Sequence, residues 1–303
     1  MALPWILVLA SGLALPDLSA AAAQSPRPAA CRKVTRGTAL WETARQPKMV
    51  AHCKALARGY SELELAPARA LLAAESADRV APGKAAPMVL AGRALAALGK
   101  YEDAYKRFDK ALAIDKSAVE EPEALLAYAR SAMRAGKQSQ AARAYSALAS
   151  RIALLSTPWL RQRAAIETGL SAMDDGKLPQ AIGVLSEARR RENMPGLGGL
   201  VQATLALALD RQGRSEQARG VAREVEGVQA LWDLAEAPPA SWPAYAPIVP
   251  PGQLWAVVAL VIEREDRGQA KDAWKRFLDS PAGRGPHRAH AQAHLDRLSG
   301  RGR

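Results

Sequence analysis

Apolar and small residues recur along most of this chain at spacings of three and four, which is the period of an amphipathic α-helix. The clearest stretch runs from Ala86 to Lys116 and reads APMVLAGRALAALGKYEDAYKRFDKALAIDK. Its two halves predict two short helices joined at Gly99-Lys100. Ala104, Phe108 and Ala111 share one face of the second helix. A hairpin with one apolar face must stack on a neighbour.

The same pattern recurs along the chain. Four predicted turn glycines, separated by 37, 40 and 37 residues, are Gly99, Gly136, Gly176 and Gly213. Two weaker units flank these four. The first has Leu56, Ala68 and Leu72 with Leu63 at the turn, and the last has Gly268, Ala273 and Phe277 after the apolar helix Leu254–Ile262. We therefore expect about six repeats over Pro47 to Ser280, within a helical domain spanning residues 47–299.

Gly92 within the first helix, the turn at Gly99 and the Ala104–Phe108–Ala111 face together resemble the tetratricopeptide repeat. The resemblance implies an all-α, right-handed superhelical solenoid of helix-turn-helix units. Lys116 replaces the family's closing proline, and the units exceed the family norm of about 34 residues. A generic antiparallel helix array is the alternative.

The spacing breaks before the last unit, where 55 residues separate Gly213 from Gly268. The segment 237–252 (APPASWPAYAPIVPPG) contains six prolines and cannot be helical. It is either a strap packed on the array or a proline-rich ligand for another domain. Trp242 and Tyr245 favour the strap, because they would otherwise be exposed.

The first 23 residues are typical of an export signal. An apolar run, Pro4 to Leu15, precedes small residues ending at Ala23, where we expect cleavage. The run is too short to cross a bilayer, and a buried helix is the alternative interpretation. Because the apolar stretch Leu254–Ile262 is only about half the length that a span needs, we expect no transmembrane segment in the mature chain. Residues 24–46 then form an N-terminal segment before the repeats. The expected location is the periplasm or the exterior of a bacterium.

The chain has two cysteines, Cys31 and Cys53. In an oxidising compartment such an even pair near one end predicts a disulfide. Two unpaired thiols, with Cys53 buried on a helix, are the alternative.

The formal net charge is +12. Such a surplus attracts polyanions, and for an exported protein we expect anionic envelope polymers or acidic proteins as partners and no nucleic acid. A merely soluble surface is the alternative. The densest cationic cluster comprises Arg284, Arg288, Arg297, Arg301 and Arg303.

Catalytic motifs are missing from the sequence: it has no phosphate-binding Gly-Lys-Ser/Thr loop, no His-Glu-x-x-His and no nucleophile motif. We therefore expect neither an enzyme nor a cofactor. His287, His290 and His294 would share one face of a helix, where adjacent pairs can chelate a transition metal. Because no Cys or acidic ligand joins them and Arg288 adds positive charge nearby, we expect a capping helix and no metal.

The resemblance implies a concave face lined by the first helices of successive repeats. Arg93 follows the small residue Gly92, and Arg130 follows Ala129, so both are expected to point into this groove. The full set of expected partner-binding residues is Arg93, Arg130, Met133, Arg134, Arg163, Leu170, Met173, Leu207 and Arg211. Such a groove suits an acidic, then apolar, protein segment. Alternatively, these arginines pair with acidic residues of neighbouring helices.

Two functions follow from these patterns. One is a non-catalytic scaffold in the cell envelope that binds a partner segment in the groove. The other is a basic protein that binds envelope polymers through its charge.

Overall fold

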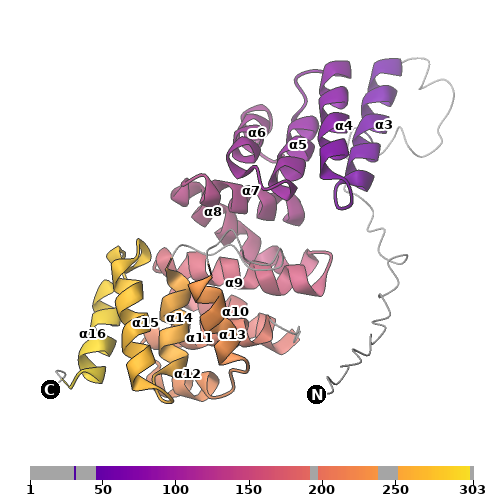
Figure 1. The fold of residues 1–303 in the computed structure, drawn as a ribbon. Helices are drawn as coiled ribbons and strands as arrows, with labels where there is room; N and C mark the ends of the chain where they lie inside the picture. Colours follow the sequence, from indigo (N-terminus) through magenta and orange to yellow (C-terminus); the bar gives the residue numbers. More distant parts are fainter. Residues whose placement is uncertain (1–30, 32–45, 192–196, 238–251, 301–303) are drawn as a thin grey trace, which may run out of the picture.

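The computed structural model describes Cys31 and residues 46–191, 197–237 and 252–300. This part of the chain is helical and contains no β-strand. Twelve helices form six antiparallel hairpins that follow one another in chain order (Figure 1). They are α3 (Pro47–Glu62) with α4 (Pro67–Val80), α5 (Ala85–Ala97) with α6 (Tyr101–Ile114), α7 (Pro122–Arg134) with α8 (Gln138–Leu148), α9 (Pro158–Asp174) with α10 (Leu178–Arg191), α11 (Gly198–Arg211) with α12 (Ser215–Ala222), and α14 (Gln253–Ile262) with α15 (Arg267–Asp279). The predicted all-α array of about six stacked hairpins is confirmed.

Two further helices stand outside the hairpins. Helix α13 (Val228–Glu236) lies between the fifth and sixth hairpins and packs on α14. Helix α16 (Arg288–Leu298) packs on α15 at the C-terminal end of the array (Figure 1). Short 3-10 helices occur at η1 (Ala149–Leu154) and η3 (Ala282–Arg284). None of the described helices has the length and apolar character that a bilayer span requires.

Four hairpins share one turn geometry. Their glycines have positive φ angles between 71° and 80°, a conformation that costs other residues a steric clash at Cβ. The next residue's N–H donates to the carbonyl five positions earlier, a bond that closes the helix end. The four bonds, 2.8–2.9 Å long, run from Lys100 to Leu95, Lys137 to Ala132, Lys177 to Ala172 and Arg214 to Leu209. Local sequence thus determines where these hairpins turn.

Small residues bring the helices of a hairpin close together. A Cβ atom at Gly92 would lie 2.9 Å from the ring of Phe108, which is fully buried. A Cβ at Gly169 would lie 2.8 Å from the side chain of Leu185. Gly92 and Phe108 are the residues that the repeat pattern predicts at this contact, so the pattern has the correct register in that hairpin.

The two flanking hairpins differ from the predicted pattern. In α4 the interior positions are Ala70, Ala74 and Ala77, whereas Ala68 and Leu72 are exposed. The predicted register fails there because this turn lacks a glycine and the second helix starts only at Pro67. In the last hairpin Gly268 lies inside α15, and the carboxylate of Asp266 caps the helix by accepting the N–H groups of Gly268 and Gln269.

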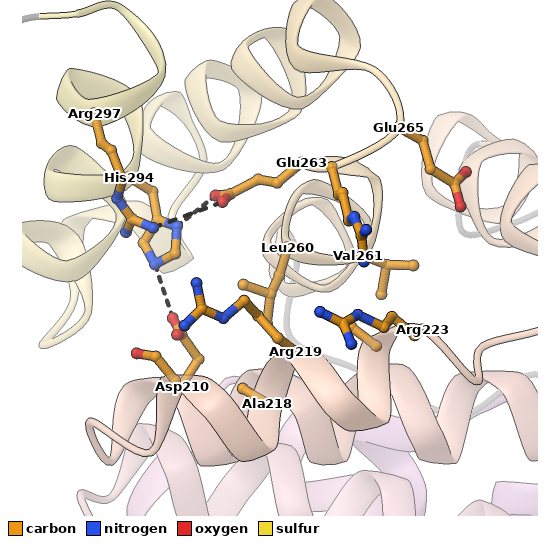
Figure 2. A pocket seen from close by; sticks show the side chains of 13 residues that line it. Asp210, Ala218, Arg219, Arg223, Leu260, Val261, Glu263, Glu265, His294 and Arg297 are labelled. Carbon is orange, nitrogen blue, oxygen red and sulfur yellow. Dashed lines mark hydrogen bonds and ion pairs between the residues drawn. The ribbon is translucent and has the colours of Figure 1, made fainter.

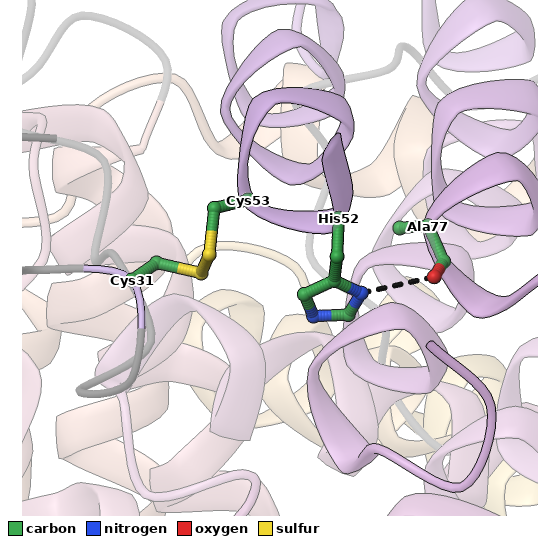
Figure 3. Close-up of a disulfide and its surroundings, with 4 residues drawn as sticks. All are labelled: Cys31, His52, Cys53 and Ala77. Atoms are coloured by element: carbon green, nitrogen blue, oxygen red, sulfur yellow. Dashed lines mark hydrogen bonds between the residues drawn. A yellow bond between two sulfur atoms is a disulfide. The ribbon is translucent and has the colours of Figure 1, made fainter. Parts of the chain in front are cut away.

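A disulfide joins Cys31 to Cys53 on α3, with the two Cα atoms 5.5 Å apart (Figure 3). Both cysteines are buried beside the first two hairpins. On the same helix, His52 Nδ1 lies 2.9 Å from the carbonyl oxygen of Ala77 and links α3 to α4. The predicted signal segment 1–23, the stretch 24–30 and residues 238–251 of the proline-rich segment lie outside the described residues.

Candidate functional site

The predicted groove arginine Arg93 forms an internal ion pair. Its Nη1 atom donates to Glu121 Oε2 at 2.9 Å, which connects α5 to the start of α7. Glu121 also caps α7 by accepting the backbone N–H groups of Glu123 and Ala124. Burial raises the pKa of Glu121 to about 7, and the positive charge of Arg93 opposes this rise.

A second internal network surrounds Glu167 on α9, whose side chain is 0% exposed. Arg130 Nε donates to Glu167 Oε2 at 2.8 Å, and Arg163 Nε donates to Glu167 Oε1 at 3.1 Å. The hydroxyl of Tyr145 donates to the same carboxylate at 3.3 Å. Both arginines are largely buried, so this network holds α7, α8 and α9 together. For Arg93, Arg130 and Arg163 the structure thus favours pairing with neighbouring helices.

The apolar residues predicted for the groove are core residues. Leu170, Met173 and Leu207 are each 0% exposed and do not line an open surface. Every residue of α9 from position 162 to 173 is buried, because helices cover it on several sides. An open concave face would leave one side of this helix in solvent. The prediction that Leu170, Met173 and Leu207 line a partner-binding groove is therefore wrong.

The remaining three predicted residues have different environments. Arg211 is enclosed, with its Nη2 donating to Gln253 at 3.1 Å and its guanidinium 5.8 Å from the ring centre of Phe277. Arg134 is exposed, with its guanidinium 5.9 Å from the ring centre of Tyr101. Met133 is half-buried and borders an open cleft of about 330 Å³.

This cleft, which we call the Met133 cleft, lies between the α7–α8 turn, the end of α9 and the segment before α16. Both apolar and polar groups line it. Its walls are formed by Met133, Gln138, Ser139, Ala142, Ser171, Asp174, Asp175, Pro281, Ala282, Gly285 and Pro286. Burial raises the pKa of Asp174 to about 6, with Arg211 opposing this rise.

A polar cluster of a different kind joins α11, α14 and α16. His290 Nε2 lies 2.6 Å and His294 Nε2 lies 2.8 Å from the same atom, Asp210 Oδ2. The second ring nitrogen of His294, Nδ1, contacts Glu263 Oε1. That carboxylate oxygen also accepts the indole N–H of Trp274 at 2.7 Å. We call Asp210, His290, His294 and Glu263 the His–Asp cluster.

The His–Asp cluster is largely withdrawn from solvent. Asp210 is 8% and His294 3% exposed, and His290 is half-buried. Burial favours a raised pKa for Asp210, but the contacts with His290 and His294 outweigh it and hold the pKa well below its usual value. Burial favours a lowered pKa for His294, yet its contacts with Asp210 and Glu263 raise it. The carboxylate of Asp210 is therefore ionised at neutral pH.

An open cavity of about 340 Å³ borders this cluster (Figure 2). Asp210, Glu263 and His294 lie along one side of it. The rest of its polar wall consists of four arginines, one glutamate and one serine: Arg219, Arg223, Arg264, Arg297, Glu265 and Ser215. Solvent thus reaches the edge of the cluster from an arginine-lined cavity.

The histidine pattern predicted only part of this cluster. His290 and His294 do share a face of α16, with ring centres 4.6 Å apart. His287 does not join them: α16 begins at Arg288, and the Nε2 atom of His287 lies 2.9 Å from the carbonyl oxygen of Met173. The acidic partners were missed because Asp210 is 80 residues from His290 in the chain. No local signal brings α11 and α16 together.

Comparisons with known proteins add little to this description. No protein-family model matches the chain, and no curated protein matches it. Among solved structures, it is similar to a chain in the crystal structure of the APC/C hetero-tetramer Cut9-Hcn1, with 16% identity and a TM-score of 0.36. The match covers 84% of this chain and 56% of that one. A similarity this low supports no statement about the function of this protein.

Proposed function

We propose that the protein is a non-catalytic scaffold that binds a segment of a partner protein in the Met133 cleft. The observation that carries this proposal is the cleft itself: an open groove of about 330 Å³ lined by both apolar side chains and polar groups. Apolar surface provides the affinity of such grooves, and a few placed polar groups provide orientation. Stacked hairpins supply a rigid frame for it.

The chemistry of the cleft suggests the kind of segment it binds. Met133, Ala142 and Pro281 offer apolar contacts, whereas Asp174 and Asp175 bring two carboxyl groups, of which Asp175 pairs with Lys177 at 2.6 Å. The arginines that favoured an acidic segment are paired with Glu121 and Glu167 instead. Among the predicted arginines, only Arg134, next to Met133, is exposed. We therefore propose that the bound segment is apolar and either neutral or basic.

We also propose that the protein works outside the cytoplasm, in the periplasm or as a secreted protein. Two features support this location. The sequence starts with an apolar run and small residues typical of an export signal. The disulfide between Cys31 and Cys53 is a bond that persists in oxidising compartments.

Site-specific photo-crosslinking in the producing cells tests the scaffold proposal. A photoreactive residue at Ser139, exposed in the cleft, should crosslink to one discrete protein partner. The matched control position is Lys110, an exposed residue of α6 that lies outside the cleft. Met133→Glu in the Ser139 background should abolish the crosslink. Equal crosslinking at both positions, or a crosslink unaffected by Met133→Glu, would refute the cleft as the binding site.

Envelope-polymer binding is a second candidate, favoured by the net charge of +12. Binding of this kind is dominated by counterion release and weakens steeply as salt rises. Binding in the Met133 cleft should change little between 50 and 300 mM NaCl. The second candidate would be favoured if affinity for an anionic cell-wall polymer falls steeply over this range and is the same in the Met133→Glu variant.

A further inference from the structure

Two histidines and one aspartate bring their ligand atoms to a single point in the His–Asp cluster. The Nε2 atoms of His290 and His294 both face Asp210 Oδ2, at 2.6 and 2.8 Å. One ligand atom from each of the three residues can be chosen so that all lie within 4.8 Å of one another. The histidines are one helical turn apart on α16, and the aspartate comes from α11, so the arrangement depends on the tertiary fold.

Both ring nitrogens of His294 face carboxylate oxygens. A neutral imidazole carries one N–H, and the neighbouring Glu263 Oε1 requires it on Nδ1. The Nε2 lone pair then faces an oxygen of Asp210, and two acceptors at 2.8 Å repel each other unless a positive group lies between them. Either a second proton on the imidazole or a bound cation must lie between them. The Nε2 atom of His290 faces the same oxygen, so a cation there would take nitrogens from both imidazoles.

Glu263 has the position of an orienting carboxylate behind a metal-binding histidine. Metal-ligating histidines usually donate their other ring N–H to a carboxylate, which sets the tautomer and orients the ring. Glu263 is itself held by the indole N–H of Trp274 at 2.7 Å. The ring of Trp274 also lies 4.8 Å, centre to centre, from the ring of His294. The imidazole is thus fixed before any ion binds.

We propose that Asp210, His290 and His294 bind a divalent transition-metal ion of the zinc class, with Glu263 orienting His294. Two imidazole nitrogens and a carboxylate oxygen are donors that Zn²⁺ accepts in sites with an open fourth position. Tetrahedral coordination places such donor atoms roughly 3.4 Å apart, at metal–ligand distances of about 2.0–2.2 Å. The two contacts with Asp210 Oδ2 therefore need to open by under about 1 Å, and the histidine nitrogens, which lie within 4.8 Å of each other, need to approach that spacing.

The cavity beside the cluster supplies the access route and the open coordination position. Asp210 and His294 both line it, so an ion can reach them from solvent. Arg219, Arg223 and Arg297 line the same cavity and favour an anion, rather than a further cation, as the additional ligand. Water or a small carboxylate or phosphate group would then complete the coordination.

Metal titration of the full, tag-free chain tests this proposal after the protein has been stripped with a chelator. Co²⁺ is the probe, because its visible absorption reports the ligand geometry, and Zn²⁺ should displace it. We expect one Co²⁺ per chain with the intense visible bands of a tetrahedral or five-coordinate site. Stray binding is limited, because the chain has only four histidines.

Substitutions test which residues bind the ion. Asp210→Asn and His290→Gln should each weaken Zn²⁺ binding at least 100-fold, whereas Glu263→Gln should weaken it about 10–100-fold because it acts through His294. His287→Gln is the matched control: this histidine adjoins the same helix but contacts the carbonyl of Met173, and its removal should leave affinity unchanged. Circular dichroism checks that each variant is folded.

Two results would overturn the proposal. If the folded wild-type chain binds neither Co²⁺ nor Zn²⁺ at one equivalent, a proton rather than a metal bridges His294 and Asp210. If binding occurs but survives both Asp210→Asn and His290→Gln, the ion lies elsewhere. The wild-type stoichiometry decides the matter even if one of these variants fails to fold.

Discussion

Replacing Glu167 with glutamine should destabilise the array strongly, because this carboxylate neutralises two enclosed arginines. The side chain of Glu167 is 0% exposed, and those of Arg130 and Arg163 are 13% and 9% exposed. Glutamine keeps the size of the side chain and one acceptor oxygen but removes the charge. Arg130 and Arg163 then retain their charges without this counter-ion in a low-dielectric environment.

The magnitude follows from the burial of the network. Removing one partner of a buried ion pair typically costs about 3–5 kcal/mol of folding free energy. In a domain of this size each kcal/mol lowers Tm by about 2–4 °C, so the expected decrease is about 6–20 °C. The control is Glu102→Gln, which breaks the exposed 3.1 Å pair with Lys106 and should leave Tm unchanged.

Thermal and urea unfolding followed by circular dichroism measure this effect. Repeat arrays can unfold in parts, so hydrogen exchange of α9 amides should accompany the melting curves. A triple variant with Arg130→Met, Glu167→Leu and Arg163→Met should recover most of the lost stability, since buried ion networks are often replaceable by apolar groups. If the Glu167→Gln variant has the same Tm as the Glu102→Gln control, the network around Glu167 does not hold these helices together.

Three further outcomes are expected. Gly92→Ala places a Cβ 2.9 Å from the Phe108 ring and should cost about 1–3 kcal/mol. Gly183→Ala, which meets nothing within 4 Å on α10, should instead stabilise by about 0.5–1 kcal/mol; similar melting temperatures for the two variants would contradict the packing. Mass spectrometry without reductant should find Cys31 linked to Cys53, and Cys31→Ser should lower the unfolding free energy by about 3 kcal/mol; two alkylated thiols in native protein would contradict it. Because the pKa of Glu121 is raised from 4.5 to about 7, the folded state loses stability as pH rises through this range. The Tm of Glu121→Gln relative to wild type should therefore increase from pH 5 to pH 8, and a constant difference would refute the raised pKa.

The hairpins of this protein were predictable because their causes are local. Helical periodicity lies within a dozen residues, and a glycine such as Gly99 ends a helix through its own φ angle. The contact between Gly92 and Phe108 joins two helices of one hairpin, so the repeat pattern already contains it. Where the local signal was weak, as in α4, the helix was predicted correctly but its buried face was displaced by two residues.

The candidate sites depend on contacts that no local pattern encodes. The sequence alone placed Arg130 beside Ala129 on a helix face, but only the tertiary arrangement of the helices brought its guanidinium to Glu167 of α9, 37 residues away. Helix α9 packs against α8, α10 and α11, and these neighbours enclose Leu170. The sequence determined that His290 and His294 lie one turn apart, whereas the tertiary structure brought Asp210 to them from 80 residues away. Helix formation depends on nearby residues, but the partner of a polar side chain depends on which helices pack together, and that is decided by the whole array.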